Sequence, residues 1–134
     1  MNSLDLVKQY VLAVEQFDLA AAEPLMGEGM TFTELPNRIR PKGGTDDREA
    51  MLAGLAKAGE RKMLSSQRYI WGETIETADR VVVEARWEGT MAMALGALQP
   101  GDTMVAHICM IFGISGGKIA WQRNYDCYED FAAK

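Results

Sequence analysis

A polar pair near the end of the chain has the residue types and spacing that acid–base chemistry needs. Asn124 and Asp126 lie two residues apart in the stretch KIAWQRNYDCYEDF, residues 118–131. Side chains alternate between the faces of a strand, so both lie on one face, together with those of Gln122 and Tyr128. A carboxyl can exchange a proton, whereas an amide can only orient a carbonyl group or a water. We interpret this face as the floor of a pocket.

Glu34 is the strongest single candidate for a general base. It ends a short predicted strand, residues 30–34, and a carboxylate there that faces an apolar pocket can accept a proton. Two other interpretations stay open, an ion pair with Arg38 or Arg40 in the following loop and simple exposure at the strand end. Asp126 has a similar alternative, because a bulge in this strand would turn its carboxylate outward.

Three aromatic or imidazole side chains could belong to a site, but each also fits an ordinary structural role. Tyr10 lies on an apolar helix stripe and is expected to be a core aromatic, with a hydrogen-bonding role in a site as the alternative. Trp87 is expected to form a pocket wall. His107, the only histidine, lies on the outer sheet face by alternation, where Glu84 or Tyr125 is its expected partner.

Helical patterns precede the sheet and supply the elements that cover it. Asn2 or Ser3 caps a predicted helix that runs to about Phe17, with apolar residues at helical spacing. Asp18 caps a second short helix through Met26. Residues 37–45 have the composition of a loop. Asp46, with Glu49 three residues later, forms a predicted capping box for a helix to about Lys62.

From Met63 onward the apolar pattern changes to period two, which predicts antiparallel strands joined by turn residues. We expect four, at residues 64–77, 80–93, 103–114 and 118–128. Their inward faces, with one side chain of the earlier strand, would line the pocket. These predicted ligand contacts are Phe32, Val83, Ala85, Trp87, Ala106, Ile108, Met110 and Gln122. The apolar segment 92–98 is expected to be a pocket rim or a subunit contact.

Composition excludes several classes of function. At 134 residues, 48% apolar and 25% charged, the chain is expected to form one globular domain, residues 1–134. The net charge of −5 without a Lys/Arg cluster argues against a nucleic-acid partner. No apolar run is long enough to span a bilayer, and no signal peptide is evident, so we expect no membrane partner. Two cysteines without a framework spacing predict reduced core thiols in a cytoplasmic protein. With one histidine, neither a metal site nor a cofactor is expected.

The order of elements, with the segments FTELPNRIRPKG, VVVEARWEGT and IFGISGGKIAWQRNYD, resembles the nuclear-transport-factor-2-like superfamily. The resemblance is greatest to its SnoaL-like branch. It implies an α+β fold in which N-terminal helices pack on a strongly curved, mainly antiparallel sheet that forms a cone with an internal pocket. It also implies a small apolar ligand and a homodimer through the outer sheet face.

Enzymes of this superfamily suggest roles for particular residues. The Tyr10 and Asp18 spacing is similar to that of ketosteroid isomerase, whose base falls on Glu34 and whose second acid falls near Ile108. The tail motif of limonene-epoxide hydrolase aligns with residues 122–127, which places Asn124 where that family has its catalytic carboxylate. The tail acid of SnoaL-type cyclases resembles Asp126.

The resulting hypothesis is an isomerase, cyclase or hydrolase that acts on an apolar compound containing a carbonyl group. Glu34 would remove a proton, and Tyr10, Asn124 and Asp126 would stabilise the enolate oxygen. Two alternatives stay open. The chain would bind an apolar ligand without changing it, since Ile108 cannot donate a hydrogen bond, or it would be a dimeric assembly module.

Overall fold

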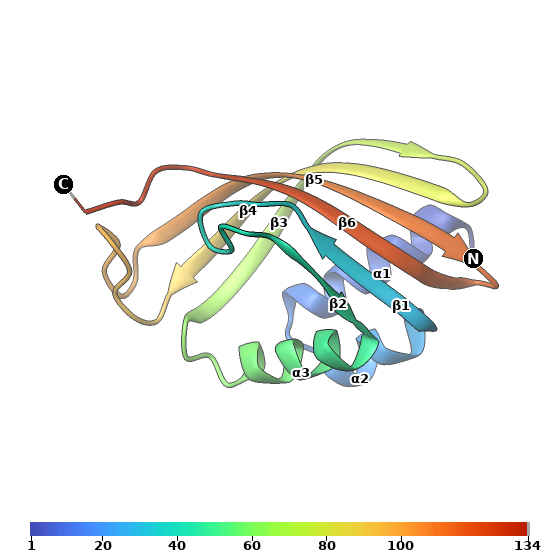
Figure 1. Ribbon diagram of the computed structural model, residues 1–134, viewed down its shortest axis with the longest axis horizontal. Coiled ribbons are helices and arrows are strands. Elements are labelled where there is room, and N and C mark those ends of the chain that lie inside the picture. The colour runs from blue at the N-terminus through green and yellow to red at the C-terminus, as the bar shows by residue number, and fades with distance from the viewer. Residues whose placement is uncertain (134) are drawn as a thin grey trace.

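Helices and one strand pair precede a meander of four long strands in the computed structural model, which describes residues 1–133 (Figure 1). The elements are α1 (Ser3–Glu15), α2 (Leu19–Ala22), the 3₁₀ turn η1 (Glu23–Leu25), β1 (Met26–Glu34), β2 (Gly44–Asp47), α3 (Arg48–Gly59), β3 (Leu64–Glu76), β4 (Arg80–Met91), β5 (Thr103–Ser115) and β6 (Lys118–Tyr128). The predicted meander and the helices that flank it are therefore present.

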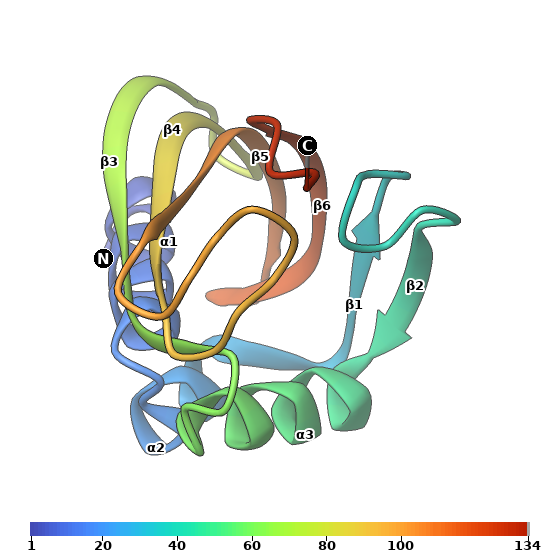
Figure 2. The ribbon, with the colours of Figure 1, turned by 90° about the vertical axis from the view of Figure 1, so that its left-hand side faces the viewer.

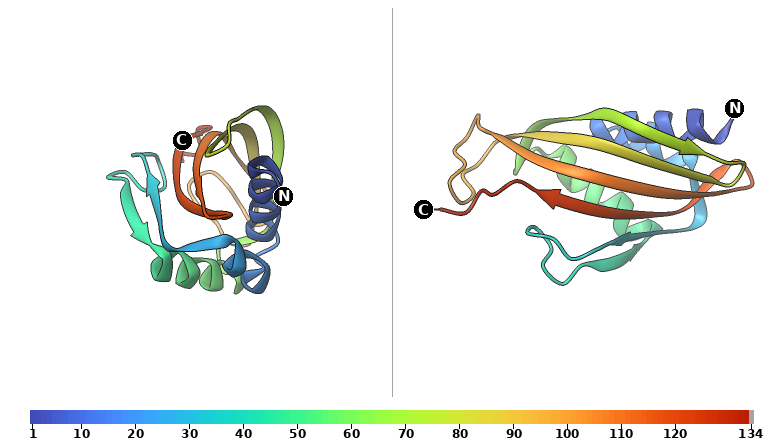
Figure 3. Two further views of the ribbon diagram at one scale, coloured as in Figure 1. Left: turned by 90° about the vertical axis from the view of Figure 1, so that its right-hand side faces the viewer. Right: turned by 90° about the horizontal axis from the view of Figure 1, so that it is seen from above.

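The six strands form one sheet in the order β2–β1–β6–β5–β4–β3. All neighbours are antiparallel except β1 and β6, which run parallel. Viewed end-on, the sheet curls without closing, with α1 against its concave side and α3 below β1 and β2 (Figure 2). The same arrangement is visible from the opposite end (Figure 3). The prediction of an α+β fold with helices on a strongly curved, mainly antiparallel sheet is confirmed.

The core lies between α1 and the concave face of the sheet. Inward side chains of β4 and β5 alternate with outward ones, and Val81, Val83, Met110 and Phe112 are at most 1% exposed. Tyr10 of α1 packs edge-on against Phe112, with ring centroids 6.3 Å apart. Burying such side chains stabilises the fold by roughly 1.5–3 kcal/mol each relative to exposure. The apolar alternation of the strands thus determines which face curls inward.

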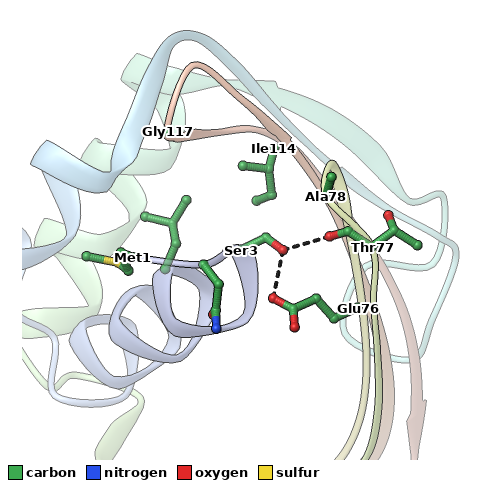
Figure 4. Close-up of a pocket in the computed structure, with 9 residues that line it drawn as sticks. Met1, Ser3, Glu76, Thr77, Ala78, Ile114 and Gly117 are labelled. Atoms are coloured by element: carbon green, nitrogen blue, oxygen red, sulfur yellow. Dashed lines mark hydrogen bonds between the residues drawn. The ribbon is translucent and has the colours of Figure 1, made fainter.

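Helix α1 is attached to the sheet by its first turn. Asn2 caps the helix by accepting from the Asp5 amide. Glu76, at the end of β3, accepts from the Leu4 amide at 2.8 Å and from the Ser3 hydroxyl at 3.0 Å, where a carboxylate also favours the helix N-terminus. Figure 4 shows Ser3 bonded to Glu76 and Thr77 beside an open hollow that Ile114 and Gly117 also line. Because Ser3 and Glu76 bond to each other and to the backbone, we interpret this hollow as a structural junction.

Several predicted boundaries were wrong. Strand β1 begins at Met26 rather than at residue 30, and the predicted loop, residues 37–45, overlaps the start of β2 at Gly44. Asp47, not Asp46, caps α3 by accepting from the Ala50 amide. Asp46 pairs with Arg40 instead, because β2 places its side chain beside the preceding loop.

The short helices and the cysteines also differ from the predictions. Helix α2 ends at Ala22, where Pro24 follows within the 3₁₀ turn. Strand β4 ends at Met91, two residues early. Cys109 and Cys127 are free thiols, as expected, but they lie on the outer sheet face, half-buried and exposed, rather than in the core.

The apolar segment 92–98 packs against its own chain at the end of the molecule away from the N-terminus. The Ala97 amide donates to the Phe131 carbonyl at 2.8 Å, and Leu95 and Leu98 pack against the core. Figure 2 shows this connection crossing the end of the curled sheet. Among the helices in residues 1–133, none is long and apolar enough to cross a membrane.

Candidate functional site

A pocket of about 630 Å³ lies between the concave face of the sheet, α1 and α3. Its volume is within the range of small-molecule sites. Half of the predicted site residues line it. These are Tyr10, Phe32, Glu34, Met110, Gln122 and Asn124. Methionine and leucine side chains from α3 complete the apolar wall.

The other predicted ligand contacts lie on the same face of the sheet but do not line this pocket. Val83, Ala85, Trp87, Ala106 and Ile108 are all at most 7% exposed and belong to the core. The Trp87 indole donates to Gln67 at 2.9 Å, and Gln67 donates to the end of α1. Contact of these five residues with a ligand stays a prediction.

Glu34 ends β1 and is held by the loop that follows. The Asn37 amide donates to Glu34 at 3.2 Å, and the Arg40 guanidinium lies 3.6 Å from its other oxygen. Arg40 also forms a bidentate ion pair with Asp46, in which its two terminal nitrogens donate to the two carboxylate oxygens at 3.0 and 3.2 Å. Of the two arginines considered from the sequence, Arg40 is therefore the partner of Glu34, while Arg38 pairs with Asp130.

Asp126, the remaining predicted site residue, lies on the inward face of β6 and is half-buried, but it is not among the residues that line the pocket. One carboxyl oxygen is buried without a hydrogen-bond partner within residues 1–133. Burial and the nearby charge of Glu34 raise the pKa of Asp126 to about 6, and a hydrogen bond from Asn124 offsets part of this rise. A carboxyl with this pKa exchanges its proton near neutral pH, which is what a general acid or base requires.

Register brings these two carboxyls together. Glu34 is the parallel partner of Asn124 in β6, and Asp126 follows two residues later on the same face. The Leu35 amide donates to the Asn124 carbonyl, which extends the pairing of β1 and β6 beyond Glu34. The Gln122 amide donates to the Asn124 side chain at 2.9 Å, so these two amides form a fixed polar floor.

Three tyrosines surround the polar floor. Burial raises the pKa of Tyr10 to about 12 and that of Tyr69 and Tyr128 further, with Asp126 adding to the effect on the latter two. All three therefore keep their protons at neutral pH and can serve as hydrogen-bond donors. Within residues 1–133, no hydrogen bond engages the hydroxyl of Tyr10 or Tyr69, and both residues line the pocket.

Sequence reasoning did not identify Tyr69, Asn37 or Asp46 as part of the site. Gln67, Tyr69 and Trp71 lie on the same, less exposed face of β3, and this alternation could have identified Tyr69. The polar residues around them make that face difficult to recognise in the sequence. Asn37 and Asp46 contribute through the turn between β1 and β2, whose shape depends on backbone hydrogen bonds to the Asn37 side chain. No local sequence pattern predicts such a turn.

His107 lies outside this site, on the outer sheet face as predicted, but its predicted partners were wrong. Its ring lies 2.9 Å from Glu129 rather than beside Glu84 or Tyr125, because the strand turns Glu129 onto the same face. Within residues 1–133, no group of three or more His, Cys, Asp or Glu side chains could hold a metal ion.

Comparison with solved structures identifies the class of protein. IdmH from Streptomyces antibioticus, a proposed polyketide cyclase, is 17% identical with a TM-score of 0.74, over 92% of this chain and 90% of that one. AclR from Streptomyces galilaeus, a proposed hydroxylase, is 14% identical with a TM-score of 0.72, over 92% and 77%. A Catenulispora acidiphila protein with a ketosteroid isomerase-like fold, in complex with trimethylamine, is 17% identical with a TM-score of 0.71, over 93% and 86%. The fold is that of nuclear-transport-factor-2-like proteins.

The family follows from the sequence comparison. The SnoaL-like domain model matches residues 7–122, so the chain belongs to the SnoaL-like family. No curated protein matches it significantly. The resemblance stated from the three sequence segments is thus confirmed.

Proposed function

We propose that this protein is an acid–base enzyme that acts on an apolar, carbonyl-containing small molecule in the pocket between the sheet and α3. The observation that carries the proposal is the buried, unpartnered oxygen of Asp126, which lies two residues along β6 from the pocket-lining Asn124 and on the same face. A buried carboxyl oxygen without a partner costs stability, and such a cost is often associated with a functional site. The solved relatives that are proposed to be a cyclase and a hydroxylase support a small-molecule enzyme.

In the proposed reaction Asp126 removes a proton from the carbon next to the carbonyl. The C–H electron pair then forms the enolate, whose oxygen accepts hydrogen bonds from the Tyr10 hydroxyl and the Asn124 amide. Return of the proton from Asp126 to another carbon gives an isomerase. Attack of the enolate carbon on a second carbonyl breaks the C=O π bond, and the resulting alkoxide takes the proton from Asp126, which gives a cyclase. Between the two carboxyls, the geometry favours Asp126 over Glu34, because Glu34 is engaged with Arg40 and Asn37.

The test begins with mass spectrometry of small molecules that co-purify with the protein, followed by turnover of the identified compound. Asp126→Asn should lower kcat by about 100-fold or more, the usual contribution of general acid–base catalysis. The pKa of Asp126, about 6, predicts a limb near that pH in the rate profile of the wild type, and Asp126→Asn should abolish it. The matched control is Asp5→Asn, an exposed carboxyl in the first turn of α1. Unchanged turnover by Asp126→Asn would refute the proposal.

One observation favours a non-catalytic binding protein as the second candidate. Ile108 is the cross-strand partner of Asp126, so the position that the resemblance assigns to a second acid offers no hydrogen bond. A co-purifying compound that the wild type binds but never converts would favour this candidate.

A further inference from the structure

The side chains that line the pocket carry negative charge and no positive charge. Glu34 and Asp46 both line it, and among the residues 1–133 that line it there is no lysine, arginine or histidine. Arg40 lies between the two carboxylates, at 3.6 Å from Glu34 and 3.0 Å from Asp46, so these three groups together carry one negative charge. Ionised Asp126 adds a second charge near Glu34. An anionic ligand would therefore be repelled.

Aromatic rings make the same pocket suited to a cation. Tyr10, Phe17, Phe32 and Tyr69 line it, and the faces of such rings attract ammonium groups. Tyr10 is only 5% exposed and its hydroxyl has no partner within residues 1–133. Tyr10 lines the pocket, and its unpartnered hydroxyl oxygen can accept a hydrogen bond from an ammonium group there.

We propose that the pocket takes an apolar compound that carries a protonated amine, with the ammonium group against Glu34 and the aromatic rings. This inference rests on the proposed function in that it uses the same pocket, and it narrows the substrate class to amino-carbonyl compounds. The apolar wall from α3 would hold the hydrocarbon body of such a compound. The pairing with Arg40 does not prevent Glu34 from binding an ammonium group, since a carboxylate can accept several hydrogen bonds.

The test uses three probes with one hydrocarbon body and different charge: adamantylmethylamine, adamantylmethanol and adamantanecarboxylate. Calorimetric titration of the full chain at pH 7.5 should give at least about tenfold tighter binding of the amine than of the alcohol, and no measurable binding of the carboxylate. Equal or tighter binding of the alcohol would overturn the inference while leaving the proposed pocket intact. Failure of all three probes to bind would overturn the inference together with the pocket on which the proposed function depends.

Two charge-matched variants locate the effect. Glu34→Gln should remove most of the preference for the amine and leave the affinity for the alcohol within about twofold. Glu28→Gln removes the same charge from an exposed position of β1 outside the pocket and should keep the full preference. If both variants lose the preference equally, the selectivity arises from net charge and the proposed contact with Glu34 is wrong. Circular dichroism of both variants establishes that the fold is intact.

Discussion

The Asp126 carboxyl is the residue whose environment differs most from that of an ordinary surface acid. It pairs across the strands with Ile108 of β5, and its charge acts on the nearby Tyr69 and Tyr128. Desolvation disfavours the charged form, and the neighbouring Glu34 disfavours it further. The folded protein therefore carries an energetic cost at neutral pH that a ligand able to bond this oxygen would relieve.

This cost predicts a particular dependence of stability on pH. Folding raises the pKa of Asp126 from its usual 3.8 to about 6, so between these values the folded state binds more protons than the unfolded state. The free energy of unfolding therefore falls as pH rises through that window. Asp126→Asn removes the charge, so the variant should match the wild type near pH 4 and exceed it at pH 8. The gain should be at most about 3 kcal/mol, measured by urea denaturation.

The matched control for this measurement is an exposed acid. Asp5→Asn should show no gain at pH 8, because the Asp5 carboxylate is solvated and lies near the positive end of the α1 dipole. The opposite result would be a free energy of unfolding that rises with pH in the wild type relative to Asp126→Asn. It would show that the fold stabilises the carboxylate, contrary to the environment described above.

At the scale of elements, the loop between β1 and β2 positions Glu34. The Asn37 side chain accepts from the amides of Ile39 and Arg40, and the Arg40 carbonyl accepts from Asn37 and Gly43. These bonds close a compact turn that returns the chain to pair β2 with β1. The local composition predicted a loop, but the hydrogen bonds of this turn determine where Arg40 and Asp46 lie.

Gly43 is the residue on which this turn depends. It has a φ of 59°, and an added Cβ would lie 2.5 Å from the Glu34 carbonyl oxygen. Gly43→Ala should therefore lower the free energy of unfolding by about 2 kcal/mol and weaken ligand binding through displacement of Glu34. Denaturant unfolding and titration with the amine probe measure the two effects.

Gly29→Ala, in β1 before this turn, is the control. Nothing lies within 4 Å of a Cβ at Gly29 and its φ is not positive, so stability should change by less than about 0.5 kcal/mol. Equal losses for the two variants would mean that strand composition, rather than the shape of the turn, limits stability.

At the scale of the whole molecule, the expected homodimer concerns the outer face of the sheet. Ile70 of β3 and Tyr125 of β6 are 42% and 43% exposed there, and both border a shallow hollow on that face. Tyr125→Glu places a charge at this surface in both copies, so a dimer that uses it should dissociate to monomers. Sedimentation at micromolar concentration should give twice the monomer mass for the wild type and the monomer mass for the variant.

Leu12→Glu provides the control for the dimer. Leu12 is 50% exposed on the solvent face of α1, away from the sheet surface, so this variant should stay dimeric. A monomeric wild type would contradict the prediction and would also remove the alternative of an assembly module.

Periodicity in the sequence was sufficient for the architecture. The alternation of apolar residues in residues 81–87 and 104–112 predicted which face of the sheet is buried, because burial of one face leaves a period of two in any half-buried strand. The same alternation placed Asn124 and Asp126 on one inward face. Boundaries were less accurate where a turn or cap depends on one side chain, as at Asp47 and Gly44.

Only the tertiary structure decided which of these residues meet. Glu34 lies beside Asn124 because β1 joins β6 in parallel, a pairing between strands some 90 residues apart that no local pattern encodes. The unpartnered oxygen of Asp126 and the inclusion of Tyr69 in the pocket depend on how the curled sheet brings its strands together. The pairing of Glu34 with Arg40 depends on the turn between β1 and β2. Side-chain chemistry is local and can be inferred from the sequence, whereas charge environment depends on neighbours that the curling of the sheet brings together.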